Sequence, residues 1–112
     1  MAGDFDGVRR DAARRAINPR KRLVARRTSR WTPNLVINPE DNRPFTEAAA
    51  WDFLASALGK GQDIHEIEFE GPPRTRAYYM VISVDNDRRI YIKFQLGFED
   101  IIGISFHNSE HD

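Results

Sequence analysis

The C-terminal third of the chain alternates apolar and polar residues, which is typical of half-buried β-strands. The pattern is clearest over residues 77–84 and 90–107, and a shorter stretch covers 64–70. Over 90–107 one face of the predicted strands carries Ile90, Ile92, Phe94, Leu96, Ile102, Ile104 and Phe106. The opposite face carries Tyr91, Lys93, Gln95, Ser105 and His107. We therefore predict an antiparallel β-meander of about three to five strands with one buried face.

Side-chain parity restricts how the predicted strands pair, because a slip of one residue moves the apolar set to the wrong face. Pairing Leu96 with Ile102 keeps apolar side chains together and sets His107 opposite Tyr91. A register two residues tighter sets His107 near Arg89 instead, and parity allows both.

The same argument applies to the hairpin between the strand 77–84 and the strand that follows it. Pairing Ile82 with Ile92 keeps the apolar face continuous. This register places Tyr79 beside Gln95 on the polar face.

The segment 46–59 is the clearest predicted helix. Thr46 is a good N-cap, and Gly59 is a good stop signal. Its apolar stripe consists of Ala50, Phe53, Leu54, Ala57 and Leu58. A helix with this stripe covers the apolar face of the meander, so we predict a single two-layer α+β domain over residues 31–112.

Residues 1–30 predict a helical arm in front of this domain. A helix that Asp6 caps fits residues 7–17. A second helix fits the residues that follow, with Asn18 as N-cap and Pro19 at the first helical position. Its apolar face is thin, so this second helix gains little from burial.

The formal net charge is zero, but the charges are unevenly placed. Residues 1–30 hold ten Lys and Arg against three acidic residues, whereas residues 31–112 hold seven basic and fourteen acidic residues. Such a split predicts a basic arm on an acidic body. The arm can meet nucleic acid, an acidic partner or the body itself, or it can be a solvated helix pair. Arg22 and Arg26 are its candidates for contact with RNA.

The composition excludes several classes of site. The chain has no Cys, so it has no disulfide, thiolate nucleophile or Cys-ligated zinc. Its start lacks an apolar stretch, and no apolar run approaches the roughly 20 residues of a membrane span. We expect a cytoplasmic protein without membrane contact. His65, His107 and His111 lack ligand-like spacing, so we expect no metal and no cofactor.

The polar face of the last hairpin carries the candidate chemistry. Tyr91, Lys93 and His107 lie within one or two pleats, about 5 Å apart when directly opposite and about 7–8 Å on the diagonal. Imidazole transfers protons near neutral pH, an ammonium group stabilises a phosphate transition state, and a phenol donates a hydrogen bond. These groups satisfy a metal-free ribonuclease, whose nucleophile is the 2′-hydroxyl of the RNA. The alternative is the ordinary solvated face of a sheet.

Arg74 and Arg76 follow a Gly-Pro-Pro sequence and enter a strand beside this face. They are candidates for holding phosphate, because guanidinium groups bind it in bidentate fashion. They can equally pair with the alternating acidic residues of 66–70.

The stretch "IYIKFQLGFEDIIGISFH" (90–107) resembles the C-terminal hairpin of MqsR-type mRNA interferase toxins, which belong to the RelE-like group of toxin–antitoxin systems. In that family an apolar-Tyr-apolar-Lys strand is followed by a turn and by a strand ending in Ser-Phe and a basic residue. The resemblance covers residues 77–107. It aligns the family's catalytic Tyr with Tyr91 and its C-terminal catalytic Lys with His107, and Lys93 matches the strand pattern.

This resemblance implies a twisted antiparallel sheet with helices on one face. It also implies metal-independent cleavage of mRNA, either free or on the ribosome, and silencing by a cognate antitoxin protein. The alternative function is a non-catalytic binding module, such as an inhibitor, that docks a protein or nucleic acid through the basic arm or the exposed sheet face.

Overall fold

The computed structural model describes residues 5–25, 30–67, 76–85 and 87–109. Its elements are α1 (Asp6–Ala16), a 3-10 helix (Pro19–Lys21), β1 (Arg22–Val24), β2 (Arg30–Trp31), a further 3-10 helix (Pro33–Leu35), β3 (Ile37–Asn38), β4 (Arg43–Pro44), α2 (Glu47–Gly59), β5 (His65–Ile67), β6 (Arg76–Ser83), β7 (Arg89–Leu96) and β8 (Ile101–Asn108). Helices pack on a mostly antiparallel sheet, so the predicted α+β class is confirmed.

The main sheet has the strand order β1-β8-β7-β6-β5, and β2 also pairs with β8. Strands β5 to β8 form the predicted antiparallel meander. β1 and β2 run parallel to β8 along its outer edge, beside residues 101–103 and 105–106. This parallel edge was not predicted, because pairing between segments so far apart in the sequence leaves no local pattern.

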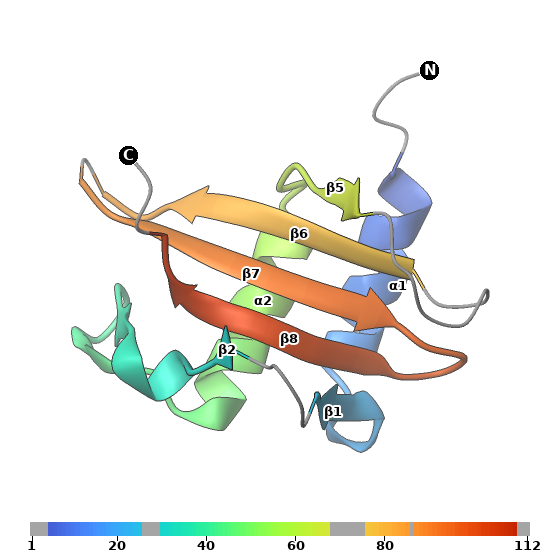
Figure 1. Ribbon diagram of the computed structural model, residues 1–112, viewed down its shortest axis with the longest axis horizontal. Coiled ribbons are helices and arrows are strands. Elements are labelled where there is room, and N and C mark those ends of the chain that lie inside the picture. Colours follow the sequence, from blue (N-terminus) through green and yellow to red (C-terminus); the bar gives the residue numbers. More distant parts are fainter. Residues whose placement is uncertain (1–4, 26–29, 68–75, 86, 110–112) are drawn as a thin grey trace.

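The helices α1 and α2 lie on one face of the sheet, behind it in the view of Figure 1. The sheet contributes these fully buried side chains to the core: Tyr78, Met80, Ile90, Ile92, Phe94, Ile101 and Phe106. Burying a large apolar side chain stabilises the fold by about 1.5–3 kcal/mol, so this seam is a main source of stability. No described helix covers the other side, which we call the open face.

The last hairpin pairs His107 with Tyr91, which is one of the two registers that the sequence allowed. Farther along the same hairpin a β-bulge shifts the register, so that Leu96 pairs with Ile101. The predicted pairing of Leu96 with Ile102 is therefore wrong. A bulge adds one residue to one strand and moves the following side chains to the other face.

The hairpin of β6 and β7 has the predicted parity, but its register is shifted by two residues. Tyr79 lies opposite Lys93, two positions from its predicted partner. The Asp85 carboxylate accepts hydrogen bonds from the backbone amides of Asp87 and Arg88 at 3.0 and 2.9 Å. The Asp85 side chain stabilises this local turn, beside which Ser83 pairs with Arg89.

Helix α2 begins and ends close to its predicted limits. The Thr46 hydroxyl accepts a hydrogen bond from the Ala49 amide at 3.0 Å, which confirms the N-cap. The helix ends at Gly59, and the chain then turns through Gly61, whose φ of 89° suits a residue without a side chain. No helix in the described part of the chain is long and apolar enough to cross a membrane.

The predicted basic arm over 1–30 is not confirmed as a separate unit where the structure describes it. Ala12 and Ala16 of α1 have no exposed surface and belong to the same core as α2. The prediction of a second helix from Asn18 is wrong. The Asn18 side chain instead caps a 3-10 turn, where it accepts a hydrogen bond from the Arg20 amide at 3.0 Å. β1 then satisfies the open edge of β8, which would otherwise expose backbone donors and acceptors.

Several cations of this N-terminal segment bind the body itself. Arg15 donates to the backbone carbonyls of Gly97 and Asp100 at 3.1 and 2.9 Å, in the turn between β7 and β8. Lys21 pairs with Glu99 of the same turn at 3.6 Å. These contacts favour the alternative in which the positive charge meets the domain rather than a distant partner.

β2 places Trp31 across the buried side of β8. Its ring centroid lies 4.9 Å from that of Trp51 and 5.4 Å from that of Phe106. The indole N–H groups of Trp31 and Trp51 both donate to the Glu47 carboxylate, at 3.2 and 3.0 Å. The approach depends on Gly103, because a Cβ there would lie 2.6 Å from the Trp31 ring.

Replacing Arg15 with Ala should lower the free energy of unfolding by about 1.5–3 kcal/mol, since charged hydrogen bonds to the turn carbonyls are lost. Arg14 is the matched control, because it is an exposed neighbour on the same helix. Arg14→Ala should change stability by less than about 0.5 kcal/mol. Urea denaturation measures both variants, and equal effects would show that the Arg15 contacts carry no stability.

Replacing Gly103 with Ala should destabilise the protein by about 1–3 kcal/mol, because the new methyl group overpacks against Trp31. Gly59→Ala is the control, since a Cβ at Gly59 meets nothing within 4 Å. Thermal unfolding should show a lower midpoint for the first variant and an unchanged or higher one for the second. An unchanged midpoint for Gly103→Ala would contradict the close packing.

Candidate functional site

Tyr91 and His107 form a directly opposed pair on the open face, near one end of the ladder between β7 and β8. Strand β7 positions Tyr91, strand β8 positions His107, and the ladder between them fixes the register. Their ring centroids lie 5.2 Å apart with planes inclined by 29°. Lys93 lies two residues farther along β7, opposite Ser105. The structure therefore brings together Tyr91, Lys93 and His107, as the predicted register required.

The backbone orients the imidazole of His107. Its Nδ1 lies 2.9 Å from the carbonyl oxygen of Asn108. Because a carbonyl oxygen only accepts, Nδ1 carries the hydrogen and donates it. In the neutral ring Nε2 then has a free lone pair and can accept a proton.

The environment of Tyr91 favours its protonated form. Partial burial raises the pKa of the Tyr91 phenol above its ordinary value, and the neighbouring Tyr79 raises this pKa further. Tyr91 therefore keeps its hydroxyl hydrogen at neutral pH and acts as a hydrogen-bond donor rather than as a base.

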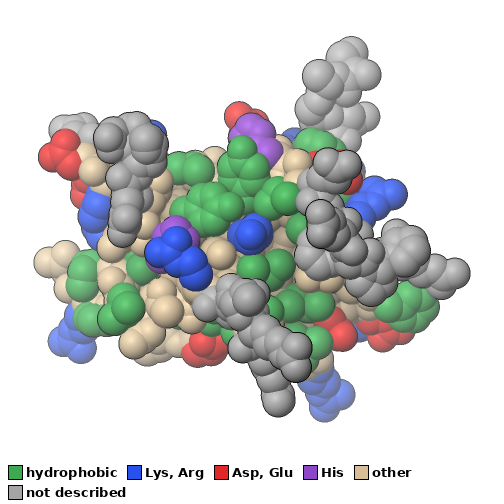
Figure 2. All heavy atoms as spheres, in the orientation of Figure 1, with side chains coloured by type: hydrophobic (Ala, Val, Ile, Leu, Met, Phe, Trp, Pro, Cys, Tyr) green, Lys and Arg blue, Asp and Glu red, His purple; other side chains and the backbone are tan. Residues whose placement is uncertain are grey.

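The Tyr91–His107 pair is part of a longer row of rings. The centroid of Tyr79 on β6 lies 5.6 Å from that of Tyr91, and the centroid of His65 on β5 lies 4.9 Å from that of Tyr79. We call His65, Tyr79, Tyr91 and His107 the ring row. Figure 2 views this face and shows His and Lys or Arg side chains among hydrophobic ones.

The sequence analysis missed the part that His65 and Tyr79 play in this row. The alternating pattern of each strand already indicated which face His65 and Tyr79 occupy. Their pairing was not visible, because parity does not fix which residue of β5 lies opposite which residue of β6.

The predicted phosphate-binding arginines do not join this site within the described residues. Arg76 lies near the Tyr78 hydroxyl and Glu66; the neighbouring Tyr78 side chain and then the charge of Glu66 raise the pKa of its guanidinium. Arg76 therefore has the parity of Tyr78, which faces the helices. Arg74 and Arg26 lie outside the described residues.

Arg22 is also directed toward the helices. Its Nε donates to the Ala16 carbonyl at 2.7 Å, and its Nη2 lies 3.4 Å from the Asp52 carboxylate. The guanidinium carbon lies 5.9 Å from the centre of the Trp51 ring. These contacts make Arg22 a structural cation that ties β1 to α1 and α2.

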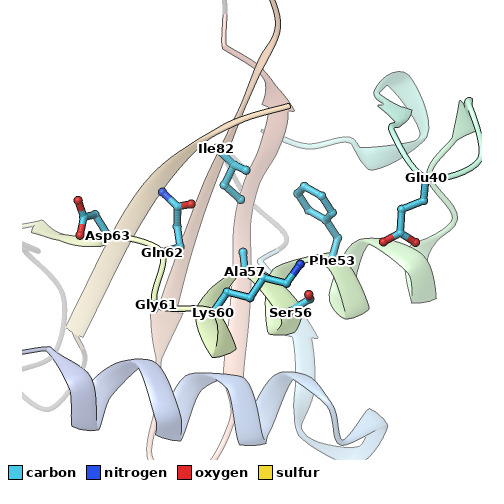
Figure 3. A pocket seen from close by; sticks show the side chains of 9 residues that line it. All are labelled: Glu40, Phe53, Ser56, Ala57, Lys60, Gly61, Gln62, Asp63 and Ile82. Carbon is cyan, nitrogen blue, oxygen red and sulfur yellow. The ribbon is translucent and has the colours of Figure 1, made fainter. Parts of the chain in front are cut away.

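A groove of about 450 Å³ lies away from the ring row, between the end of α2 and β6. Figure 3 shows Glu40 and Asp63 toward its two ends, with Lys60 between them. It contains none of the predicted site residues. Among the described residues, no cluster of His, Asp or Glu side chains is arranged to hold a metal ion.

The raised pKa of Tyr91 predicts a loss of stability at high pH. The folded state holds the phenolic proton more tightly than the unfolded state does. Protonated Tyr91 therefore makes its full contribution to the free energy of unfolding below about pH 10. It is lost as the pH rises through the higher pKa of the folded protein. Tyr91→Phe should remove this part of the pH dependence, as measured by denaturation at several pH values.

Replacing Tyr79 with Phe tests whether the neighbouring Tyr79 contributes to the raised pKa of Tyr91. Without the charge of a Tyr79 phenolate, the pKa of Tyr91 should move toward its ordinary value. NMR of labelled tyrosine rings measures this pKa directly. A wild-type Tyr91 pKa at or below the ordinary value would contradict the assignment.

Comparison with known proteins gives no relative for this chain: no family model, no curated protein and no solved structure matches it.

Proposed function

We propose that this protein is a metal-independent RNA endonuclease of the mRNA interferase type, with a RelE-like architecture. The observation that carries the proposal is the opposed Tyr91–His107 pair beside Lys93 on the open face. A proton acceptor, a hydrogen-bond donor and a cation are the groups that cleavage at a 2′-hydroxyl needs.

In the proposed reaction the 2′-oxygen of the RNA forms a bond to the adjacent phosphorus, and the bond from phosphorus to the 5′-oxygen breaks. Nε2 of His107 takes the proton of the 2′-hydroxyl. The Tyr91 hydroxyl, which keeps its proton at neutral pH, gives it to the departing 5′-oxygen. Lys93 stabilises the negative charge that develops on the phosphate. The products are a 2′,3′-cyclic phosphate and a free 5′-hydroxyl.

The other proposed properties follow from this activity. An mRNA substrate places the reaction in the cytoplasm, either on free mRNA or on the ribosome. A cognate antitoxin protein would silence the enzyme by covering the open face, where the reacting groups are accessible.

His107→Ala should lower RNA cleavage by about 10²- to 10⁴-fold, because the proton acceptor is lost. Lys93→Ala should also reduce cleavage, whereas Lys60→Ala should not, since Lys60 lines the groove behind α2. The assay uses purified protein and RNA, with and without ribosomes, and follows the cyclic phosphate. Wild-type protein that is folded and cleaves nothing in either condition would refute the proposal.

The second candidate function is a non-catalytic binding module, such as an inhibitor, that uses the open face. The observation in its favour is that the ring row extends beyond the groups that cleavage needs. A stable complex that forms equally well with His107→Ala, together with an absence of cleavage, would select this function. The basic segment is a weaker docking element, since Arg15, Lys21 and Arg22 contact the domain.

A further inference from the structure

We infer that the groove between the end of α2 and β6 binds an extended segment of a partner protein, which adds as a strand to the free edge of β6. The segment that fits has an apolar residue at its centre and basic residues on both sides. The inference is independent of the proposed function, because the groove contains none of the ring row. Its basis is the juxtaposition of an unpaired length of strand with a groove that has an apolar centre and acidic ends.

β6 is longer than the strand that pairs with its outer side. β5 pairs with β6 only over residues 77–79, whereas β6 continues to Ser83. Figure 1 shows β5 alongside only one end of β6. Within the described residues, 81–83 therefore pair with β7 on one side and with no strand on the other. We call this outer side of 81–83 the free edge.

The backbone groups of Val81 and Ser83 point to the free edge. The N–H of Val84 donates to the Arg88 carbonyl at 3.0 Å, so Val84 faces the β7 side. Alternate residues of a strand direct their N–H and C=O groups to the same side, so those of Val81 and Ser83 face away from β7. The Val81 carbonyl accepts a hydrogen bond from the Gln62 side-chain amide at 3.1 Å, which shows that an amide donor on the groove side reaches this edge. Such an edge is a template for a further strand.

The groove beside the free edge offers contacts to the side chains of an added strand. Its volume of about 450 Å³ is within the range of ligand-binding clefts. Figure 3 shows Ile82 reaching into it from β6, and Phe53 and Ala57 from α2. A residue of the added strand that lies opposite Ile82 directs its side chain to the same face of the sheet. That side chain therefore enters the apolar part of the groove.

The charges at the two ends of the groove select basic residues beside the apolar one. Glu40 and Asp63 lie toward these ends and are exposed. Within the described residues neither carboxylate forms an ion pair, and together they outweigh the charge of Lys60 between them. Residues two positions apart on a strand share a face. Basic side chains two positions before and after the central residue therefore lie on the groove side, where carboxylates are available.

A short synthetic peptide tests the inference. The probe is Lys-Thr-Val-Thr-Lys with blocked ends, whose side chains have the same order in both directions and favour a strand. Its titration into isotope-labelled full-length protein, followed by NMR, should shift the amide signals of Val81 and Ser83, because they acquire hydrogen-bond partners. The signals of β1, at the opposite edge of the sheet, should not move. An absence of binding, or shifts that leave Val81 and Ser83 in place, would overturn the inference.

Methylated peptides test whether backbone hydrogen bonds carry the binding. In an antiparallel strand, the direction that β5 and β7 both have relative to β6, the two Thr N–H groups face β6 and the Val N–H faces away. N-methylation of both Thr residues should weaken binding about 5- to 150-fold, since two hydrogen bonds are lost. N-methylation of the Val is the matched control. The reverse pattern would show a strand added in the parallel direction, and equal affinities of the two methylated peptides would overturn the inference.

Exchanged charges test the acidic ends of the groove. Glu40→Lys and Asp63→Lys should each weaken binding of the Lys-flanked peptide about 2- to 25-fold and strengthen binding of Glu-Thr-Val-Thr-Glu. Glu99→Lys is the matched control, because it makes the same change of charge in the turn between β7 and β8. Equal effects of the three variants would overturn the assignment of a basic partner.

A second copy of this chain is the alternative occupant of the free edge. If two copies join through β6, sedimentation of the protein alone will show a dimer and the peptide will leave the Val81 signal in place, which overturns the inference. A monomer that binds the peptide supports it. Neither readout depends on RNA cleavage, so the failure of this inference and the failure of the proposed function are distinguishable.

Discussion

The helices α1 and α2 pack on the same face of the sheet, and most other features of the molecule follow from this constraint. The residues of β6, β7 and β8 that face the helices are mostly apolar and fill the layer beneath them, as the fully buried Met80, Ile92 and Phe106 do. The alternate residues project from the other face, where no described helix covers them. Side chains there contact one another across the strands, and their aromatic contacts form the ring row.

This arrangement explains why the candidate chemistry lies on strands rather than in a pocket. A hydrogen-bonded ladder sets the position of Tyr91 relative to His107, so the pair needs no ligand to come together. The carbonyl of Asn108 selects the tautomer of the imidazole, and partial burial keeps the phenol protonated. The sheet therefore supplies a proton acceptor and a donor on a rigid surface, which is the usual requirement for a preorganised site.

The basic N-terminal segment has a structural role in the described residues. Arg15 and Arg22 donate to backbone carbonyls, and small alanines bring α1 into the core. Charge counted along the sequence left open whether the basic segment meets a partner or the body itself. A long cation satisfies carbonyl groups of the body as readily as phosphate, and only the folded contacts distinguish the two uses.

The sequence by itself determined the parity of the strands and the helix that Thr46 caps, because these depend on local periodicity. It gave the opposition of Tyr91 and His107 only as one of two allowed registers, and the folded hairpin chose between them. Tertiary structure alone decided the parallel edge along β8, the bulge that pairs Leu96 with Ile101, and the approach of His65 to Tyr79. These features pair segments that no local pattern connects, or they depend on the absence of a side chain at Gly103. A periodic pattern states which face a residue occupies, but packing decides which neighbour it meets there.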